Sequence, residues 1–255
     1  MRSAILRLGV IALLAGILLL HQGGTGRAQT ETEVFGLLGD TAPVWSPAGE
    51  LIAFVSTRDV KAEIYVMNAT GGDLHRLTTS PPGKGSAMPA WSPDSRRIAF
   101  VTGMMGANQI SVMSADGSGA RLLVSGGWNV KPAWSPDGRS IAFISNSTGS
   151  FGVRVIAAEG GQPLDIVSGA HLLFGFSWSP DSKRLAFATQ ESKFPMESRI
   201  SVADVNGRNL RTLIITTWSS DPAWSPDGSR IAFDSLQGGL LQILAMNADG
   251  SDAFN

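Results

Sequence analysis

The sequence repeats one short phrase five times at nearly constant spacing. Each copy contains Trp-Ser-Pro and most continue with Asp-Gly or Asp-Ser; the copies lie at residues 42–49, 88–95, 131–138, 175–182 and 221–228. Their tryptophans are 43 to 46 residues apart and are Trp45, Trp91, Trp134, Trp178 and Trp224. A period of about 45 residues built from short β-like runs is typical of β-propellers, in which each repeat forms one blade.

The residues inside one repeat predict four strands. A phenylalanine follows each repeat tryptophan by nine residues, and the Ser-Pro-Asp-Gly between them favours a type I turn followed by a left-handed residue. Ser95 and Ser182 replace the glycine of that turn, which predicts local backbone strain. A third, alternating strand leads to turns such as Asp116-Gly117, and a fourth strand follows. The predicted fold is therefore an all-β propeller of four-stranded antiparallel blades.

The two ends of the chain suggest how the ring closes. The sequence stops at Asn255, shortly after the third strand of repeat five, whereas Glu33–Leu38 reads as a strand outside any repeat. We expect this N-terminal strand to complete the last blade, so that five repeats close into a ring without exposed sheet edges. The alternative is an incomplete six-bladed ring.

The first residues predict export. Arg2 and Arg7 flank the start of an apolar run from Leu8 to Leu20, which is followed by a small-residue cleavage site ending at Ala28. Residues 1–28 are expected to be a signal peptide and residues 29–255 a single propeller domain. The apolar run is too short for an ordinary spanning helix, so no stable membrane span is expected after cleavage.

Composition restricts the possible partners. Without residues 1–28 the chain has 17 basic and 21 acidic residues, which argues against a nucleic-acid partner. There is no cysteine, so the exported fold must be stable without disulfides.

No motif in the sequence indicates catalysis. His75 and His171 lie in different repeats and lack metal-ligand spacing, and there is no Gly-x-Ser-x-Gly nucleophile elbow. The four recurrent aspartates occupy one turn position, which favours a local turn-forming role; they are Asp94, Asp137, Asp181 and Asp227. The repeat tryptophans are expected to be core wedges between blades. We therefore expect no enzyme activity, no metal and no cofactor.

Binding is expected on the loop face, opposite the Ser-Pro-Asp-Gly turns, where loops vary between repeats. Trp128 and Trp218 each stand six residues before a repeat tryptophan, in blade-linking loops, and are candidate interaction anchors. The third residue before each repeat tryptophan is expected near the mouth of the channel, where Lys131 and Asp221 supply the only charges. The candidate partner-binding residues are Trp128, Trp218, Lys131, Asp221, Met88 and Phe174.

The repeated Pro-Ala-Trp-Ser-Pro-Asp-Gly, followed by Ile-Ala-Phe, resembles the repeat of TolB-type propellers over residues 42–250. TolB itself carries an α/β domain before a six-bladed propeller that binds proteins in the periplasm, and this sequence departs from it in both respects. The resemblance implies a periplasmic or secreted scaffold that binds another envelope or secreted protein. Alternatives are a glycan-binding or polysaccharide-lyase-like propeller and a purely structural envelope component.

Overall fold

A computed structural model describes residues 39–103, 107–170, 172–190 and 197–255. All regular elements in these ranges are β-strands, which form five separate antiparallel sheets. The described residues contain no helix of the length and apolarity needed to cross a membrane. The predicted all-β class is therefore confirmed.

Each repeat forms one sheet, and the sheets are numbered here as blades in chain order. Blade 1 contains β1 (Asp40–Trp45), β2 (Leu51–Ser56), β3 (Glu63–Asn68) and β4 (His75–Arg76). Blade 2 contains β5 (Gly85–Trp91), β6 (Arg97–Gly103), β7 (Gln109–Ser114) and β8 (Arg121–Val124). Blade 3 contains β9 (Asn129–Trp134), β10 (Ser140–Ser145), β11 (Phe151–Ala157) and β12 (Leu164–Ala170). Blade 4 contains β13 (Leu172–Trp178), β14 (Arg184–Gln190), β15 (Ser198–Asp204) and β16 (Arg211–Thr216). Blade 5 contains β17 (Ser219–Trp224), β18 (Arg230–Gln237) and β19 (Leu240–Asn247).

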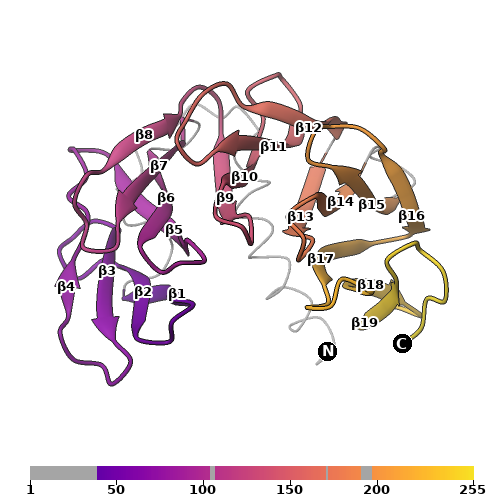
Figure 1. The fold of residues 1–255 in the computed structure, drawn as a ribbon, viewed down its shortest axis with the longest axis horizontal. Coiled ribbons are helices and arrows are strands. Elements are labelled where there is room, and N and C mark those ends of the chain that lie inside the picture. Colours follow the sequence, from indigo (N-terminus) through magenta and orange to yellow (C-terminus); the bar gives the residue numbers. More distant parts are fainter. Residues whose placement is uncertain (1–38, 104–106, 171, 191–196) are drawn as a thin grey trace, which may run out of the picture.

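The five blades stand side by side round an arc, with the first strand of each blade on the inner side (Figure 1). Blades 1 and 5 form the two ends of the arc and look toward each other across its opening. In blade 5, Phe254 lies beside β19 at the place that the fourth strand occupies in the other blades. It forms an isolated antiparallel bridge with Ala245, in which the two residues exchange two backbone hydrogen bonds. The strand expected to close the ring, Glu33–Leu38, lies outside the described residues.

The core lies between blades, because alternate side chains of a strand point to opposite faces of its sheet and a neighbouring blade covers each inward face. Four apolar clusters fill the four spaces between consecutive blades. Between blades 2 and 3, for example, Val101 and Ile110 pack against Trp134 and Phe143. Four of the five phenylalanines nine residues after the tryptophans are buried in these clusters, namely Phe100, Phe143, Phe187 and Phe233, whereas Phe54 is buried against Tyr65 of its own blade.

The repeat tryptophans act as wedges wherever another blade precedes them. The indole Nε1 of Trp91, Trp134 and Trp178 donates to a carbonyl oxygen on the inner strand of the preceding blade, at 3.2, 3.0 and 3.1 Å. Trp224 packs on the cluster between blades 4 and 5 without such a bond. Trp45 does not fit the expectation, because 57% of its surface is exposed. No blade lies before blade 1 in the described arc, so the prediction of five buried wedges was wrong at this position.

The aspartates of the repeat serve their own turns, as predicted. In each of the four turns the Asp carboxylate accepts the preceding Ser hydroxyl at 2.5–2.6 Å and a backbone N–H two residues later at 3.0–3.1 Å. The serine hydroxyl is the main reason why the pKa of each of these carboxyls is lowered, to about 2 for Asp227. These four carboxylates are therefore engaged in hydrogen bonds within their own turns.

The two serines that replace the turn glycine do adopt the strained conformation, with φ of 59° at Ser95 and 61° at Ser182. Each also makes a contact that glycine cannot make. The Ser95 hydroxyl accepts the N–H of Ala48 at 2.9 Å, and the Ser182 hydroxyl accepts the N–H of Asp137 at 3.0 Å. Because both bonds reach the turn of the preceding blade, they offset local strain by joining neighbouring blades.

Candidate binding site on the inner strands

The inner strand of every blade carries the same irregularity. The third residue before each repeat tryptophan has positive φ, with values of 50°, 52°, 51°, 140° and 44° at Ala42, Met88, Lys131, Gly175 and Asp221. In blades 1, 2, 3 and 5 the pairing register with the second strand shifts at this residue, whereas in blade 4 the shift falls at Phe174 and Gly175 itself pairs with Ala188. Such bulges take a residue out of the ladder and redirect its side chain. The inner strands thus carry five chemically different residues at the same position of the repeat, on the inner side of the arc.

Four of these five residues line a common cavity of about 230 Å³. Met88 comes from blade 2, Lys131 from blade 3, Gly175 from blade 4 and Asp221 from blade 5. Ala133, Phe176 and the inner-strand prolines Pro89 and Pro132 complete the lining. The expectation that Met88, Lys131 and Asp221 come together is met, although they lie within the inner strands rather than at a loop.

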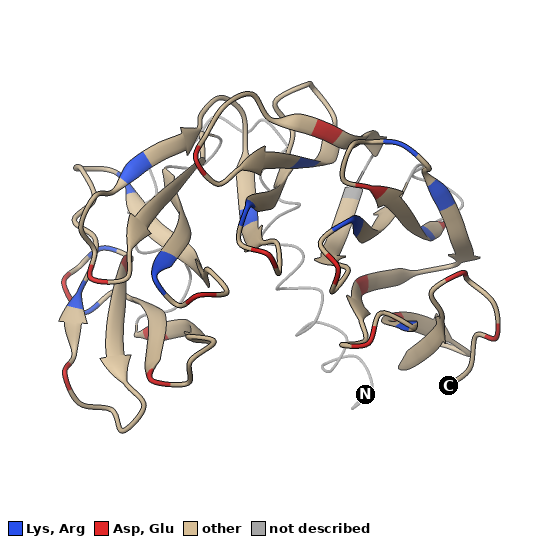
Figure 2. Ribbon diagram, viewed as in Figure 1, with Lys and Arg blue, Asp and Glu red and all other residues tan. Residues whose placement is uncertain are grey.

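Lys131 and Asp221 form an ion pair across blade 4. The distance from Lys131 Nζ to Asp221 Oδ1 is 3.6 Å, and the two side chains are 49% and 61% exposed. Pairs of this exposure contribute little to stability, so the charges remain available to a ligand. Charged residues of both signs are spread over all five blades (Figure 2), but this pair supplies the charges of the cavity.

Gly175 permits this pairing because it has no side chain. A Cβ built at this position would overlap the carboxylate of Asp221 and would lie 3.2 Å from its Cα. The glycine therefore allows the inner strand of blade 5 to approach that of blade 4 closely. The sequence contained a signal for this role, since Gly175 is the only glycine among the five bulge residues.

Met88 forms an apolar edge of the cavity. It is 41% exposed, and its Sδ accepts the backbone N–H of Lys131 at 3.5 Å. The cavity therefore presents an apolar surface beside one cation and one anion. Such a combination suits an amphipathic segment better than a purely ionic ligand.

The two additional tryptophans precede β9 and β17, in the blade-linking segments where they were expected. Trp218 packs on Phe174 of blade 4, with ring centroids 5.9 Å apart and planes tilted by 50°. Trp128 instead contacts Phe151 of its own blade edge-on at 5.5 Å, a partner that sequence reasoning missed. Both tryptophans are half-buried, so each has a packing role and an accessible part. Trp218 is thus in contact with Phe174 of blade 4, whereas Trp128 contacts Phe151 of blade 3.

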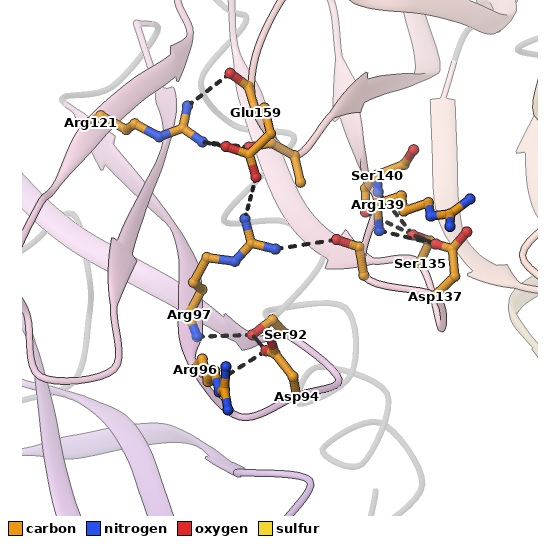
Figure 3. A network of polar contacts seen from close by, with 12 residues as sticks. Ser92, Asp94, Arg96, Arg97, Arg121, Ser135, Asp137, Arg139, Ser140 and Glu159 are labelled. Atoms are coloured by element: carbon orange, nitrogen blue, oxygen red, sulfur yellow. Dashed lines mark hydrogen bonds and ion pairs between the residues drawn. The ribbon is translucent and has the colours of Figure 1, made fainter.

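The end of the propeller that carries the Ser-Pro-Asp turns has a polar network that joins blades 2 and 3 (Figure 3). Arg97 and Arg121 of blade 2 pair with the carboxylate of Glu159 of blade 3 at 2.8 and 3.4 Å. Arg121 also donates to the carbonyl oxygen of Ala158 at 2.6 Å, and the Arg97 guanidinium lies 4.6 Å from the centroid of Trp134. These groups are engaged in holding two blades together, which favours the inner strands over this end as the binding site.

Among the described residues, no group of three histidine, aspartate or glutamate side chains is arranged to hold a metal ion. His75 is exposed at the outer edge of blade 1, where its Nδ1 lies 2.8 Å from the carbonyl oxygen of Asp73. His171 lies outside the described residues.

Comparison with known proteins gives the family. A sequence model described as the TolB beta propeller domain matches residues 17–173, which is more than half of the chain. The chain belongs to the TolB beta propeller family. The resemblance inferred from the repeated Trp-Ser-Pro phrase is thereby confirmed.

Solved structures of TolB proteins have the same fold as this TolB-family propeller. TolB from Acinetobacter baumannii superposes with a TM-score of 0.64 and 22% identity over 84% of this chain and 53% of the other. A putative TolB from Agrobacterium tumefaciens superposes with a TM-score of 0.58 and 27% identity over 72% of this chain and 69% of the other. An oligogalacturonate lyase in complex with manganese reaches a TM-score of 0.68 at 14% identity, over 85% and 64% of the two chains. This chain thus spans about half the length of the Acinetobacter TolB.

Proposed function

We propose that this TolB-family propeller is an exported, non-catalytic scaffold that binds another protein of the cell envelope through its inner strands. The observation that carries the proposal is the convergence of Met88, Lys131 and Asp221 from three different blades on one cavity. Backbone bulges hold these side chains on a rigid sheet framework, so a partner meets a preformed surface. Membership of the TolB family supports a periplasmic or secreted location.

The binding chemistry follows from the half-exposed ion pair. A partner segment that carries one carboxylate and one ammonium group can exchange the Lys131–Asp221 pair for two new pairs, while its apolar side chain covers Met88. Exchange of exposed pairs costs little desolvation, whereas burying Met88 provides apolar contact area. Trp218 and Phe174 supply a neighbouring aromatic contact on blades 4 and 5.

A charge-reversal variant tests the proposal. Lys131→Glu places a second carboxylate beside Asp221. Calorimetry with a partner captured from periplasmic extract should show an affinity at least tenfold lower than that of the unchanged protein. Lys183→Glu is the matched control, because Lys183 is exposed on the turn-bearing end and makes the same change in net charge. Equal binding by both variants would place the partner elsewhere on the propeller. Binding of oligogalacturonides, and of no protein, would favour the glycan alternative.

Export has its own test. Mass spectrometry of the protein recovered from the cell envelope should show an N-terminus at or near Gln29. A species that keeps residues 1–20 and fractionates with membranes would contradict cleavage.

A further inference from the structure

The cavity on the inner strands is small. Its volume is about 230 Å³, whereas pockets that hold drug-sized ligands usually measure about 300–1,000 Å³. Its lining comes from the inner strands β5, β9, β13 and β17, so a bound molecule would contact four blades at once. The space therefore suits a group no larger than about one amino acid.

The two charges in the cavity lining are close together without a hydrogen bond. Lys131 Nζ lies 3.6 Å from Asp221 Oδ1, which is longer than the N–H···O distance of about 2.7–3.2 Å in an ordinary hydrogen bond. Within the described ranges, no other side chain forms a hydrogen bond or ion pair with either group. The ammonium of Lys131 and the carboxylate of Asp221 therefore keep donors and acceptors for a ligand.

An α-amino acid carries the complementary charges at a matching separation. Its ammonium nitrogen and its carboxylate oxygens are joined through one Cα, which holds them about 3 Å apart. The ligand ammonium can donate to Asp221 while the ligand carboxylate accepts from Lys131, so that four charges alternate in sign. Such charge-assisted bonds are the strong ones among hydrogen bonds. A ligand with a single charge would instead take one partner of the Lys131–Asp221 pair and leave the other unpaired.

The apolar part of the lining adds a preference for the side chain of the ligand. Met88 is 41% exposed, and it adjoins the cation because its Sδ accepts the backbone N–H of Lys131. Phe176 and two prolines extend this apolar surface. An aliphatic side chain that covers Met88 gains apolar contact, whereas the single hydrogen of glycine gains none.

The backbone holds the three ligand-contacting residues in place. Met88, Lys131 and Asp221 each have positive φ, at 52°, 51° and 44°. Gly175 leaves the space beside the Asp221 carboxylate open, because a Cβ there would overlap it. These constraints belong to the sheets themselves, so the site is preformed and little ordering is needed on binding.

We infer that this cavity binds a free α-amino acid with an apolar side chain, such as leucine, through Asp221 and Lys131. This assignment rests on the inner strands being the binding surface proposed above, and it adds a small ligand for the same charged pair. Because the amino acid and a protein segment use the same two groups, the amino acid would compete with the protein partner.

Calorimetry of the purified protein with L-leucine tests the assignment, and saturable binding is expected. Three relatives of leucine each lack one of the expected contacts: N-acetyl-leucine lacks the ammonium, leucinamide lacks the carboxylate and glycine lacks the side chain. The first two should bind at least about tenfold more weakly, since hydrogen bonds to charged groups are typically worth that much. Glycine should also bind more weakly than leucine.

Two variants assign each charge of the ligand to its partner. Lys131→Met should remove the preference for leucine over leucinamide, and methionine already stands at this position of the repeat in blade 2. Asp221→Asn should remove the preference for leucine over N-acetyl-leucine, and asparagine tolerates the left-handed backbone. A general loss of structure would not change the two preferences separately. Lys183→Met, on the turn-bearing end, is the control and should bind leucine like the unchanged protein.

The results separate this assignment from the proposed function. The amino-acid site is overturned if leucine shows no saturable binding, or if N-acetyl-leucine and leucinamide bind as tightly as leucine. If that happens while Lys131→Glu still weakens a captured protein partner, the scaffold function stands without the small ligand. If leucine binds with the expected preferences but no protein partner responds to Lys131→Glu, the amino-acid site stands and the protein-binding function is overturned.

Discussion

Replacing Gly175 by alanine should destabilise the propeller through a single identifiable contact. The new Cβ would overlap the Asp221 carboxylate and sit 3.2 Å from the Cα of Asp221, so the inner strands of blades 4 and 5 must separate. A φ of 140° adds a backbone cost of about 1–3 kcal/mol for a residue with a side chain. Overpacking of this kind typically costs about 1–3 kcal/mol more. We expect a total loss of about 2–6 kcal/mol in the free energy of unfolding.

Gly161→Ala separates the two costs. Gly161 has a φ of 119°, and a Cβ there would meet nothing within 4 Å, so this variant carries the backbone penalty without the overlap. It should lose only about 1–3 kcal/mol. Urea unfolding followed by tryptophan fluorescence measures both losses, provided that the slope of the transition is unchanged.

A second substitution identifies the overlapping partner. Asp221→Ala alone should cost about 0–1 kcal/mol, because its ion pair with Lys131 is exposed. In the Gly175→Ala background the same change should restore about 1–3 kcal/mol, which appears as coupling in a double-mutant cycle. If Gly175→Ala is no worse than Gly161→Ala, or if Asp221→Ala rescues nothing, the close approach of the two inner strands is refuted.

Three further outcomes are expected. Trp134→Ala should cost about 3–5 kcal/mol in urea unfolding, because a buried wedge and its hydrogen bond are lost, whereas the half-buried Trp218 should cost clearly less when replaced by alanine. Stability should fall as the pH drops from about 4 toward 2, because the Ser225 hydroxyl lowers the folded-state pKa of Asp227 from 3.8 to about 2. Asp227→Asn should flatten that fall in acid titrations of the unfolding free energy, and an unchanged pH profile would contradict the assignment. Deleting residues 31–38 should lower the melting temperature and promote aggregation if this segment completes a blade; an unchanged melting temperature would show that it does not.

Periodic and local features could be predicted from the sequence. The spacing of the tryptophans specifies five similar sheets, and the Ser-Pro-Asp turns specify where the first two strands of each sheet meet. Both depend on residues close together in the chain, so their chemistry is the same whatever the neighbouring blade does. The turn role of the four aspartates followed from that regularity and is confirmed by their bonds to the adjacent serines.

Only the tertiary structure decided how equivalent positions differ. Trp45 and Trp134 occupy the same place in the repeat, yet one is 57% and the other 8% exposed, because burial depends on whether another blade covers the position. The ion pair of Lys131 with Asp221 likewise joins residues that are 90 positions apart in the sequence. It passes over Gly175 of blade 4, which lies between the blades of the two charged residues. The repeat placed both side chains at one level of the arc, but their contact depends on how closely blades 4 and 5 pack, which no local pattern encodes.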